Sequence, residues 1–110
     1  MTESYLVIIN GRETAKVKIS DILMVERDRR RLHIVTSEKE YIYYEKLENV
    51  EGCLDNRFYP CLKGCYINFE RISHMSDQKI YFENGYIYDI GRSNFIKTKQ
   101  KYGSYLRREI

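Results

Sequence analysis

Residues 20–52 read SDILMVERDRRRLHIVTSEKEYIYYEKLENVEG and are dominated by short runs of β-branched, apolar and aromatic residues. Polar clusters separate these runs, a pattern typical of antiparallel strands joined by tight turns. The predicted strands are Ile22–Glu26, Leu32–Thr36 and Tyr41–Tyr44. This part of the chain therefore predicts a small antiparallel sheet.

The same pattern continues on both sides of this stretch. Further strands are predicted at Tyr5–Ile9, Ala15–Ile19, Phe58–Cys61, Ile72–Met75, Lys79–Phe82 and Tyr86–Ile90. Tight connections are predicted at Asn10-Gly11, Ser37-Glu38-Lys39 and Glu83-Asn84-Gly85. Asn-Gly is a strong hairpin signal, because both central residues of a type I′ turn need positive φ.

One internal segment follows a helical pattern instead. Leu47, Val50 and Leu54 recur at spacings of three and four, which predicts a helix of about three turns between residues 45 and 54. A second helix is predicted from Ser93 to about residue 106. The 110 residues contain no repeat or Pro/Gly/Ser-rich linker. We therefore expect one mainly β domain over residues 1–110, with one internal helix and one C-terminal helix.

The predicted C-terminal helix places Phe95, Tyr102 and Leu106 on one face, with Ser93 as its N-cap. Positive charge gathers here. From residue 92 to the end, six Lys and Arg face one Glu, whereas the whole chain carries 19 basic and 16 acidic residues. A second focus lies at residues 27–31, RDRRR. Such a distribution is typical of a protein that binds a polyanion. It is also typical of a solvated surface that keeps a protein soluble.

Motifs for catalysis and metal binding are absent from the sequence. It has no GxSxG, HExxH, P-loop or GxGxxG pattern, and its two histidines lie in predicted strands. We therefore expect no enzyme activity, no small-molecule substrate, no cofactor and no metal. The cysteines form no CxxC pair and are predicted to be buried thiols. They are Cys53, Cys61 and Cys65.

The location of the protein is predicted from two further absences. No run approaches the about 20 apolar residues that a membrane span requires. Met1-Thr2-Glu3 lacks the basic head of a signal peptide. We therefore expect no membrane insertion and a cytoplasmic protein.

The eleven tyrosines allow two interpretations. Aromatic side chains on an open sheet face stack with the bases of single-stranded nucleic acids. Tyrosine is also favoured in ordinary strands and cores, and no RNP-like motif accompanies these residues. We favour the packing role. The two candidate groups are Tyr41, Tyr43 and Tyr44, and Tyr81, Tyr86 and Tyr88.

Three segments in order resemble the LytTR-type DNA-binding domain. Residues 20–52 are similar to its first half, in which a strand pair with a polar turn precedes a short helix. FYPCLKGCYINFERISHM, residues 58–75, is similar to its central segment, and KIYFENGYIYDIGRSNFIKTKQKY, residues 79–102, to its closing hairpin and terminal helix. The resemblance covers about residues 15–106.

This resemblance implies an elongated stack of antiparallel sheets in a bacterial transcription regulator of the response regulator type. Its loops would enter successive major grooves of double-stranded DNA at promoter direct repeats, with two copies bound, as a weak homodimer or assembled on the site. The implied DNA contacts are Arg29, Arg30 and Arg31 in the first turn, Lys63 and Gly64 in the central loop, and Arg92 in the last segment. Asn94 is a further predicted contact, and Lys97 and Lys99 are predicted to bind phosphates without reading sequence. Phe58 and Asn68 match structural positions of the family.

The chain departs from the family at two places. The central triplet, often His-Arg-Ser or His-Asn-Ser, is here Leu62-Lys63-Gly64, and the Ser before the last arginine is replaced by Gly91. Lys63 keeps one donor for guanine or phosphate. The alternative is a β-rich protein-interaction module that binds a sensor or membrane-associated partner through tyrosine-rich edges, DNA affinity having been lost.

Overall fold

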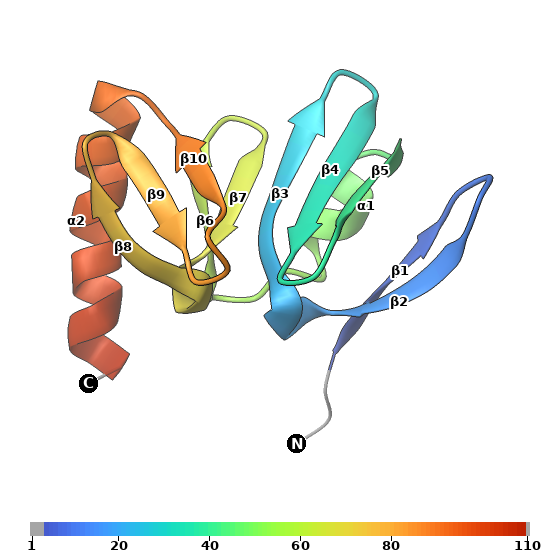
Figure 1. Cartoon of the computed structure of the whole chain (residues 1–110), viewed down its shortest axis with the longest axis horizontal. Helices are drawn as coiled ribbons and strands as arrows, with labels where there is room; N and C mark the ends of the chain where they lie inside the picture. Colours follow the sequence, from blue (N-terminus) through green and yellow to red (C-terminus); the bar gives the residue numbers. More distant parts are fainter. Residues whose placement is uncertain (1–3, 110) are drawn as a thin grey trace.

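The computed structural model describes residues 4–109, and its chain forms ten strands and two helices within that range (Figure 1). Met1–Glu3, on which the signal-peptide prediction rests, lie outside the described residues. The strands are β1 Tyr5–Ile9, β2 Thr14–Lys18, β3 Ile22–Asp28, β4 Arg31–Thr36, β5 Glu40–Tyr44, β6 Phe58–Leu62, β7 Cys65–Asn68, β8 Ile72–Ser76, β9 Lys79–Phe82 and β10 Ile87–Asp89. The helices are α1 Glu48–Glu51 and α2 Arg92–Glu109.

The strands form three antiparallel sheets. A five-stranded sheet of order β5-β4-β3-β7-β6 lies in the middle, between a β1-β2 ribbon and a three-stranded β10-β9-β8 sheet. The ribbon and α1 cover one face of the middle sheet, and the three-stranded sheet and α2 cover the other (Figure 1). The prediction of stacked antiparallel sheets with a short internal helix and a C-terminal helix is confirmed.

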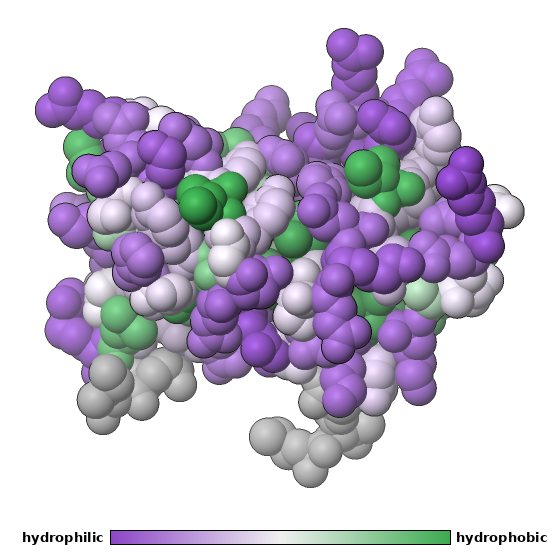
Figure 2. Space-filling model, in the orientation of Figure 1, coloured by the Kyte–Doolittle hydropathy of each residue, from purple (hydrophilic) through white to green (hydrophobic). Residues whose placement is uncertain are grey.

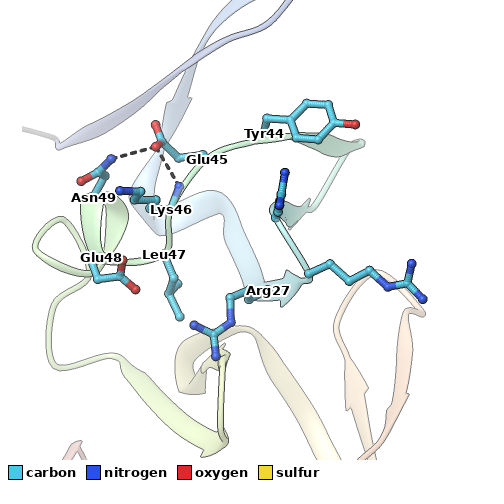
Figure 3. A pocket seen from close by; sticks show the side chains of 9 residues that line it. Arg27, Tyr44, Glu45, Lys46, Leu47, Glu48 and Asn49 are labelled. Atoms are coloured by element: carbon cyan, nitrogen blue, oxygen red, sulfur yellow. Dashed lines mark hydrogen bonds between the residues drawn. The ribbon is translucent and has the colours of Figure 1, made fainter.

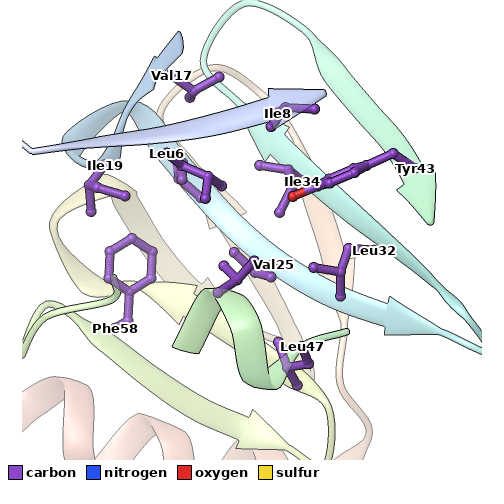
Figure 4. Close-up of a cluster of buried hydrophobic side chains, with 12 residues drawn as sticks. Leu6, Ile8, Val17, Ile19, Val25, Leu32, Ile34, Tyr43, Leu47 and Phe58 are labelled. Atoms are coloured by element: carbon purple, nitrogen blue, oxygen red, sulfur yellow. The ribbon is translucent and has the colours of Figure 1, made fainter. Parts of the chain in front are cut away.

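The buried side chains form one cluster on each face of the middle sheet. In the first cluster, Leu6 and Ile8 of β1 pack against Val25 of β3, Ile34 of β4 and Leu47 beside α1 (Figure 4). Apolar residues on both faces of β3 explain why this strand has an unbroken apolar run instead of alternation. Burial on both sides makes β3 the centre of the fold.

The second cluster holds the remaining elements against the middle sheet. Ile67 of β7 and Ile80 of β9 are fully buried in it, and Phe69 lies between the sheets and α2. The Phe69 ring packs against Tyr102 and Tyr105 of α2, with ring centroids 5.4 and 5.3 Å away. These aromatic contacts fix the helix, and therefore its N-terminal end, relative to the sheets.

Most predicted strands are confirmed within one or two residues, and one strand was missed. β7 is that strand, and it lies at the centre of the sheet between β3 and β6. Its sequence, Cys65-Tyr66-Ile67-Asn68, has side chains buried on both faces, so it lacks the alternation that identifies a half-buried strand. Asn68 also reads as a turn residue, although here its side chain is fully buried.

Three local predictions were wrong. The internal helix is α1, with only four residues, and its C-cap is Gly52, a residue type that disfavours helix. On α2 the inward face carries Thr98 and Tyr105 in place of Leu106, which is 38% exposed. Ser93 lies inside the first turn of α2 instead of capping it, since the helix begins one residue earlier.

The β1-β2 connection also differs from the predicted two-residue turn. It is a four-residue loop in which the Asn10 N–H donates to the Glu13 carbonyl oxygen at 3.0 Å. The Asn10 side chain accepts hydrogen bonds from the N–H groups of Arg12 and Glu13. An Asn side chain that closes the loop in this way does not need Gly11 at positive φ. The predicted connections at residues 37–39 and 83–85 are confirmed.

Phe58 and Asn68 are structural, as the sequence suggested. Both are buried, and the Asn68 side-chain amide donates to the Ile22 carbonyl oxygen at 2.9 Å. The Cys61 and Cys65 thiols are buried and reduced, with their sulfur atoms 3.7 Å apart. The prediction of a third buried thiol was wrong. Cys53 follows the short helix α1 and is exposed to solvent.

The face seen in Figure 2 is largely hydrophilic, with only separated hydrophobic patches. Within residues 4–109 no helix is both long and apolar enough to cross a membrane. In the same range, no three His, Cys, Asp or Glu side chains are grouped so that they could hold a metal ion.

Candidate nucleic-acid interface

Two turns and the start of α2 lie along one edge of the molecule. This is the upper edge in Figure 1, where the β3-β4 turn, the β6-β7 turn and the N-terminal end of α2 all point the same way. The pairing of β3 with β7 explains why the two turns are neighbours. Glu26 pairs with Cys65, so both strands reach the edge at about the same level. Hydrophilic side chains project from the tip of the β3-β4 turn (Figure 2).

The first turn consists of Arg29 and Arg30, between the paired residues Asp28 and Arg31. Arg29 has φ of 60°, a left-handed conformation that is uncommon for a residue with a Cβ atom. All three arginines are exposed. Arg31 forms an ion pair with Asp28 at 3.5 Å, whereas no described residue pairs with Arg29 or Arg30. Two guanidinium groups are therefore free at the tip.

The second turn consists of Lys63 and Gly64, between the paired residues Leu62 and Cys65. Gly64 has φ of +79°, which is the conformation that a type II turn requires at its second central residue. The Lys63 side chain is exposed and has no ion-pair partner among residues 4–109. The backbone conformation at position 64 therefore favours glycine, and Lys63 beside it provides a free cation.

The third point on the edge is the beginning of α2. Gly91 has φ of +78°, and its carbonyl oxygen accepts the Phe95 N–H at 3.0 Å as the helix begins. Arg92, the first residue of α2, is exposed and unpaired in the part of the chain that the structure describes. The Asn94 amide donates to the Ile90 carbonyl oxygen at 3.3 Å, so this side chain is turned back toward the loop.

The lysines of α2 project in different directions. An α-helix turns about 100° per residue, so Lys99, seven residues after Arg92, lies on the same side about two turns further on. Lys97 is rotated by about 140° from Arg92, and Lys101 by about 180°. All three lysines are exposed. The structure therefore brings Lys99 onto the side of Arg92 but not Lys97 or Lys101.

An open pocket of about 660 Å³ lies beside the first turn (Figure 3). Four cationic side chains line it together with Tyr44, Leu47, Asn49 and two glutamates, Glu45 and Glu48. The cations are Arg27, Arg29, Arg30 and Lys46. Glu45 is already engaged, because its carboxylate accepts the Asn49 amide at 2.8 Å and the Lys46 N–H at 2.9 Å. The Asn49 hydrogen bond is the main reason that the pKa of Glu45 is lowered.

Arg27 and Lys46 line this pocket, although neither was predicted to be a site residue. Arg27 belongs to the basic run at residues 27–31, which was the only available signal. Across the sheet it pairs with Leu32 of β4 on one side, and on the other its N–H donates to the Gly64 carbonyl oxygen of the β6-β7 turn, which the sequence did not predict. Lys46 follows a strand and precedes α1, where a lysine is ordinary in sequence terms. Neither position is recognisable without the pairing of strands.

The tyrosines do not form an open stacking platform. Tyr43 is buried in the first cluster, and the Tyr88 hydroxyl donates to the Glu26 carboxylate. Tyr81 stacks on His74 with ring centroids 4.3 Å apart. Tyr44, at 79% exposure, is the most exposed large hydrophobic residue of the described chain. The packing role predicted for most of these side chains is therefore confirmed.

Comparison with known proteins identifies the family. The model of the LytTr DNA-binding domain matches residues 12–103. A solved LytTr DNA-binding domain from Bacillus cereus is similar in fold, with a TM-score of 0.66, 17% sequence identity, and coverage of 97% of this chain and 96% of that chain. No curated protein sequence matches. Because the family model covers most of the chain, the chain belongs to the LytTr family of DNA-binding domains.

Proposed function

We propose that this DNA-binding domain is a sequence-specific transcription regulator whose edge enters successive major grooves of a duplex. The observation that carries the proposal is the row of unpaired cations at the β3-β4 turn, the β6-β7 turn and the start of α2. The longest dimension of the molecule is 39 Å, comparable with the about 34 Å of one turn of B-DNA. One edge is therefore long enough to follow one face of the duplex.

The roles of the cations follow from their positions. Arg30 at the tip of the first turn and Arg92 at the start of α2 are free to form bidentate hydrogen bonds with guanine O6 and N7, each worth about 1–3 kcal/mol of discrimination. Lys63 offers a single point charge between them. Lys99, further along α2, contacts phosphate and does not read sequence. Asn94 contributes by shaping the loop, because its amide already holds the Ile90 carbonyl oxygen.

The proposed partner is promoter DNA with two copies of the site arranged as a direct repeat. Two copies of the chain then bind side by side, as a weak homodimer or by assembly on the DNA. The setting is the cytoplasm, and the role is regulatory and not catalytic.

The test is a fluorescence anisotropy titration of the full chain with duplexes selected from a random pool. We expect selection to enrich one motif, bound at least about 10³-fold more tightly than random duplex. If about six phosphates are neutralised, log K should fall against log salt with a slope near −5. A flat salt response, or a pool that remains random after selection, would contradict the proposal.

A second candidate is the protein-interaction module. It is favoured by the exposure of Ile42 and Tyr44, at 52% and 79%, on β5 at the edge of the middle sheet. Substituting Ile42, which does not line the pocket beside the β3-β4 turn, by Ser should leave duplex binding unchanged if DNA is the ligand. Absence of duplex binding by the unmodified chain at low salt would favour the protein partner.

A further inference from the structure

We propose that Arg27 is an additional phosphate-binding residue of the interface, held in position by the glycine of the neighbouring turn. The inference rests on the proposed binding of duplex DNA. It assigns a role to a residue that lies on the strand β3 and not on a turn.

The backbone fixes Arg27 against the β6-β7 turn. Its main-chain N–H donates to the Gly64 carbonyl oxygen at 2.7 Å, continuing the β3-β7 ladder to the edge of the sheet. Two strands that are separated by about 40 residues in the sequence are therefore joined at this point. The main chain of Arg27 is therefore held beside Gly64 in the β6-β7 turn.

The side chain of Arg27 lies over the same glycine. A Cβ atom added to Gly64 would lie 3.5 Å from the Arg27 Cβ and Nε atoms and 3.6 Å from its Nη2 atom. In Figure 3 the Arg27 guanidinium extends from the end of β3 toward the β6-β7 turn and the Leu47 side chain. The bare backbone of Gly64 thus provides the surface against which the guanidinium rests, and this reduces the number of rotamers that DNA binding has to restrict.

The Arg27 guanidinium is available for a ligand. The side chain is exposed, and no carboxylate of the described residues forms an ion pair with it. Around it, Arg29, Arg30 and Lys46 line the same 660 Å³ pocket. The Glu45 carboxylate in that pocket is occupied by its own hydrogen bonds, which leaves Glu48 as the one lining acid with no hydrogen-bond or ion-pair partner among the described residues. Four cations against two carboxylates favour an anion.

The position of Arg27 favours a backbone phosphate over a base edge. It stands two residues before Arg29 and faces the pocket, so it is set back from the turn tips that would reach into the groove. When turn tips occupy a major groove, the strand residues behind them face the phosphates at its rim. The planar guanidinium matches two phosphate oxygens, which a lysine at the same place could not bind in the same way.

The experiment compares four full-length proteins by anisotropy with one selected duplex and one random duplex across a salt series. They are the unmodified chain, Arg27→Ala, Arg27→Lys and the control Arg108→Ala. Arg108 is exposed and lies in the last turn of α2, about 24 Å along the helix from Arg92. The control removes the same charge at the far end of the molecule, and thermal unfolding of each variant checks that the fold is retained.

We expect Arg27→Ala to weaken binding about tenfold for both duplexes alike and to reduce the salt slope by about 0.9. Arg27→Lys should keep the slope and lose a smaller part of the affinity, and Arg108→Ala should have little effect on either. An unchanged slope in folded Arg27→Ala, or a loss confined to the selected duplex, would overturn the assignment. If the unmodified chain itself fails to bind duplex at low salt, the proposed function fails, and with it this inference.

Discussion

The main-chain N–H of Arg27 and the carbonyl oxygen of Gly64 are joined by a 2.7 Å hydrogen bond. This bond lies where β3 and β7 reach the edge of the middle sheet, and it makes one rigid unit of two turns that are distant in the sequence. A readout surface needs fixed spacing between its contacts, because each donor has to meet a defined position on the duplex. The rigidity of the edge is therefore part of the proposed function.

We predict that Gly64→Ala destabilises the protein by about 1 kcal/mol, because the residue keeps φ of +79° and an L-residue pays for that conformation. Gly91→Ala is the matched control, since Gly91 has φ of +78° and open space around its Cβ position. Both should lose similar stability in urea unfolding, but only Gly64→Ala touches Arg27. An increase in stability for either variant would contradict the prediction.

Arg92 and Lys99 of α2 should have separable effects on DNA binding. Arg92→Ala is expected to flatten the preference among duplexes, because a bidentate contact to guanine is lost. Lys99→Ala is expected to weaken all duplexes by a similar factor, because a phosphate contact carries no sequence information. Binding to a panel of single-base variants of the selected site measures both. Identical profiles for the two variants would remove this division of roles.

Asn68 should be one of the most sensitive positions for folding. It is fully buried, its amide donates to the Ile22 carbonyl oxygen, and its side-chain oxygen accepts the Glu70 N–H at 2.9 Å. Asn68→Ala would leave a buried carbonyl oxygen and a part-buried N–H without their partner, which costs about 2 kcal/mol or more in total. Urea unfolding measures the loss. Asn56→Ala, in an exposed turn, is the control and should change stability by less than about 0.5 kcal/mol.

The ion pair between Asp55 and Arg57 predicts how one part of the stability depends on pH. The Arg57 Nε and Nη2 atoms donate to the Asp55 carboxylate at 2.9 and 2.6 Å, and these hydrogen bonds are the main cause of the lowered pKa of Asp55. The contribution is therefore complete above the ordinary Asp pKa of about 4 and is lost as the pH falls through the lower value of the folded state.

Urea unfolding of the unmodified protein and Asp55→Asn tests this dependence. The free energy of unfolding should differ between them at pH 6, and the difference should shrink toward pH 3. The difference should be small, since the Asp55 side chain is 44% exposed and solvent screens the pair. A difference that grows as the pH falls would show that the carboxylate is not stabilised in the folded state.

Local patterns in the sequence were enough for most strands and for the chemistry of the edge. The alternation in β2, β5 and β9 and the turn residues between strands are properties of neighbouring residues, so they can be recognised without the fold. The wrong helix length has the opposite cause. The spacing of Leu47, Val50 and Leu54 fits a helical face, but Gly52 and the packing against β3 end the helix after four residues.

The amino-acid sequence determined where most strands form, where most tight turns lie, and that arginine and lysine occur at residues 27–31, at residue 63 and from residue 92 onward. Only the tertiary structure decided that these three groups share an edge and that Arg27 rests on Gly64. The physical reason is the distance along the chain over which each interaction acts. Turn propensity and alternation act between adjacent residues, whereas the pairing of β3 with β7 depends on burying both faces of two strands that lie about 40 residues apart.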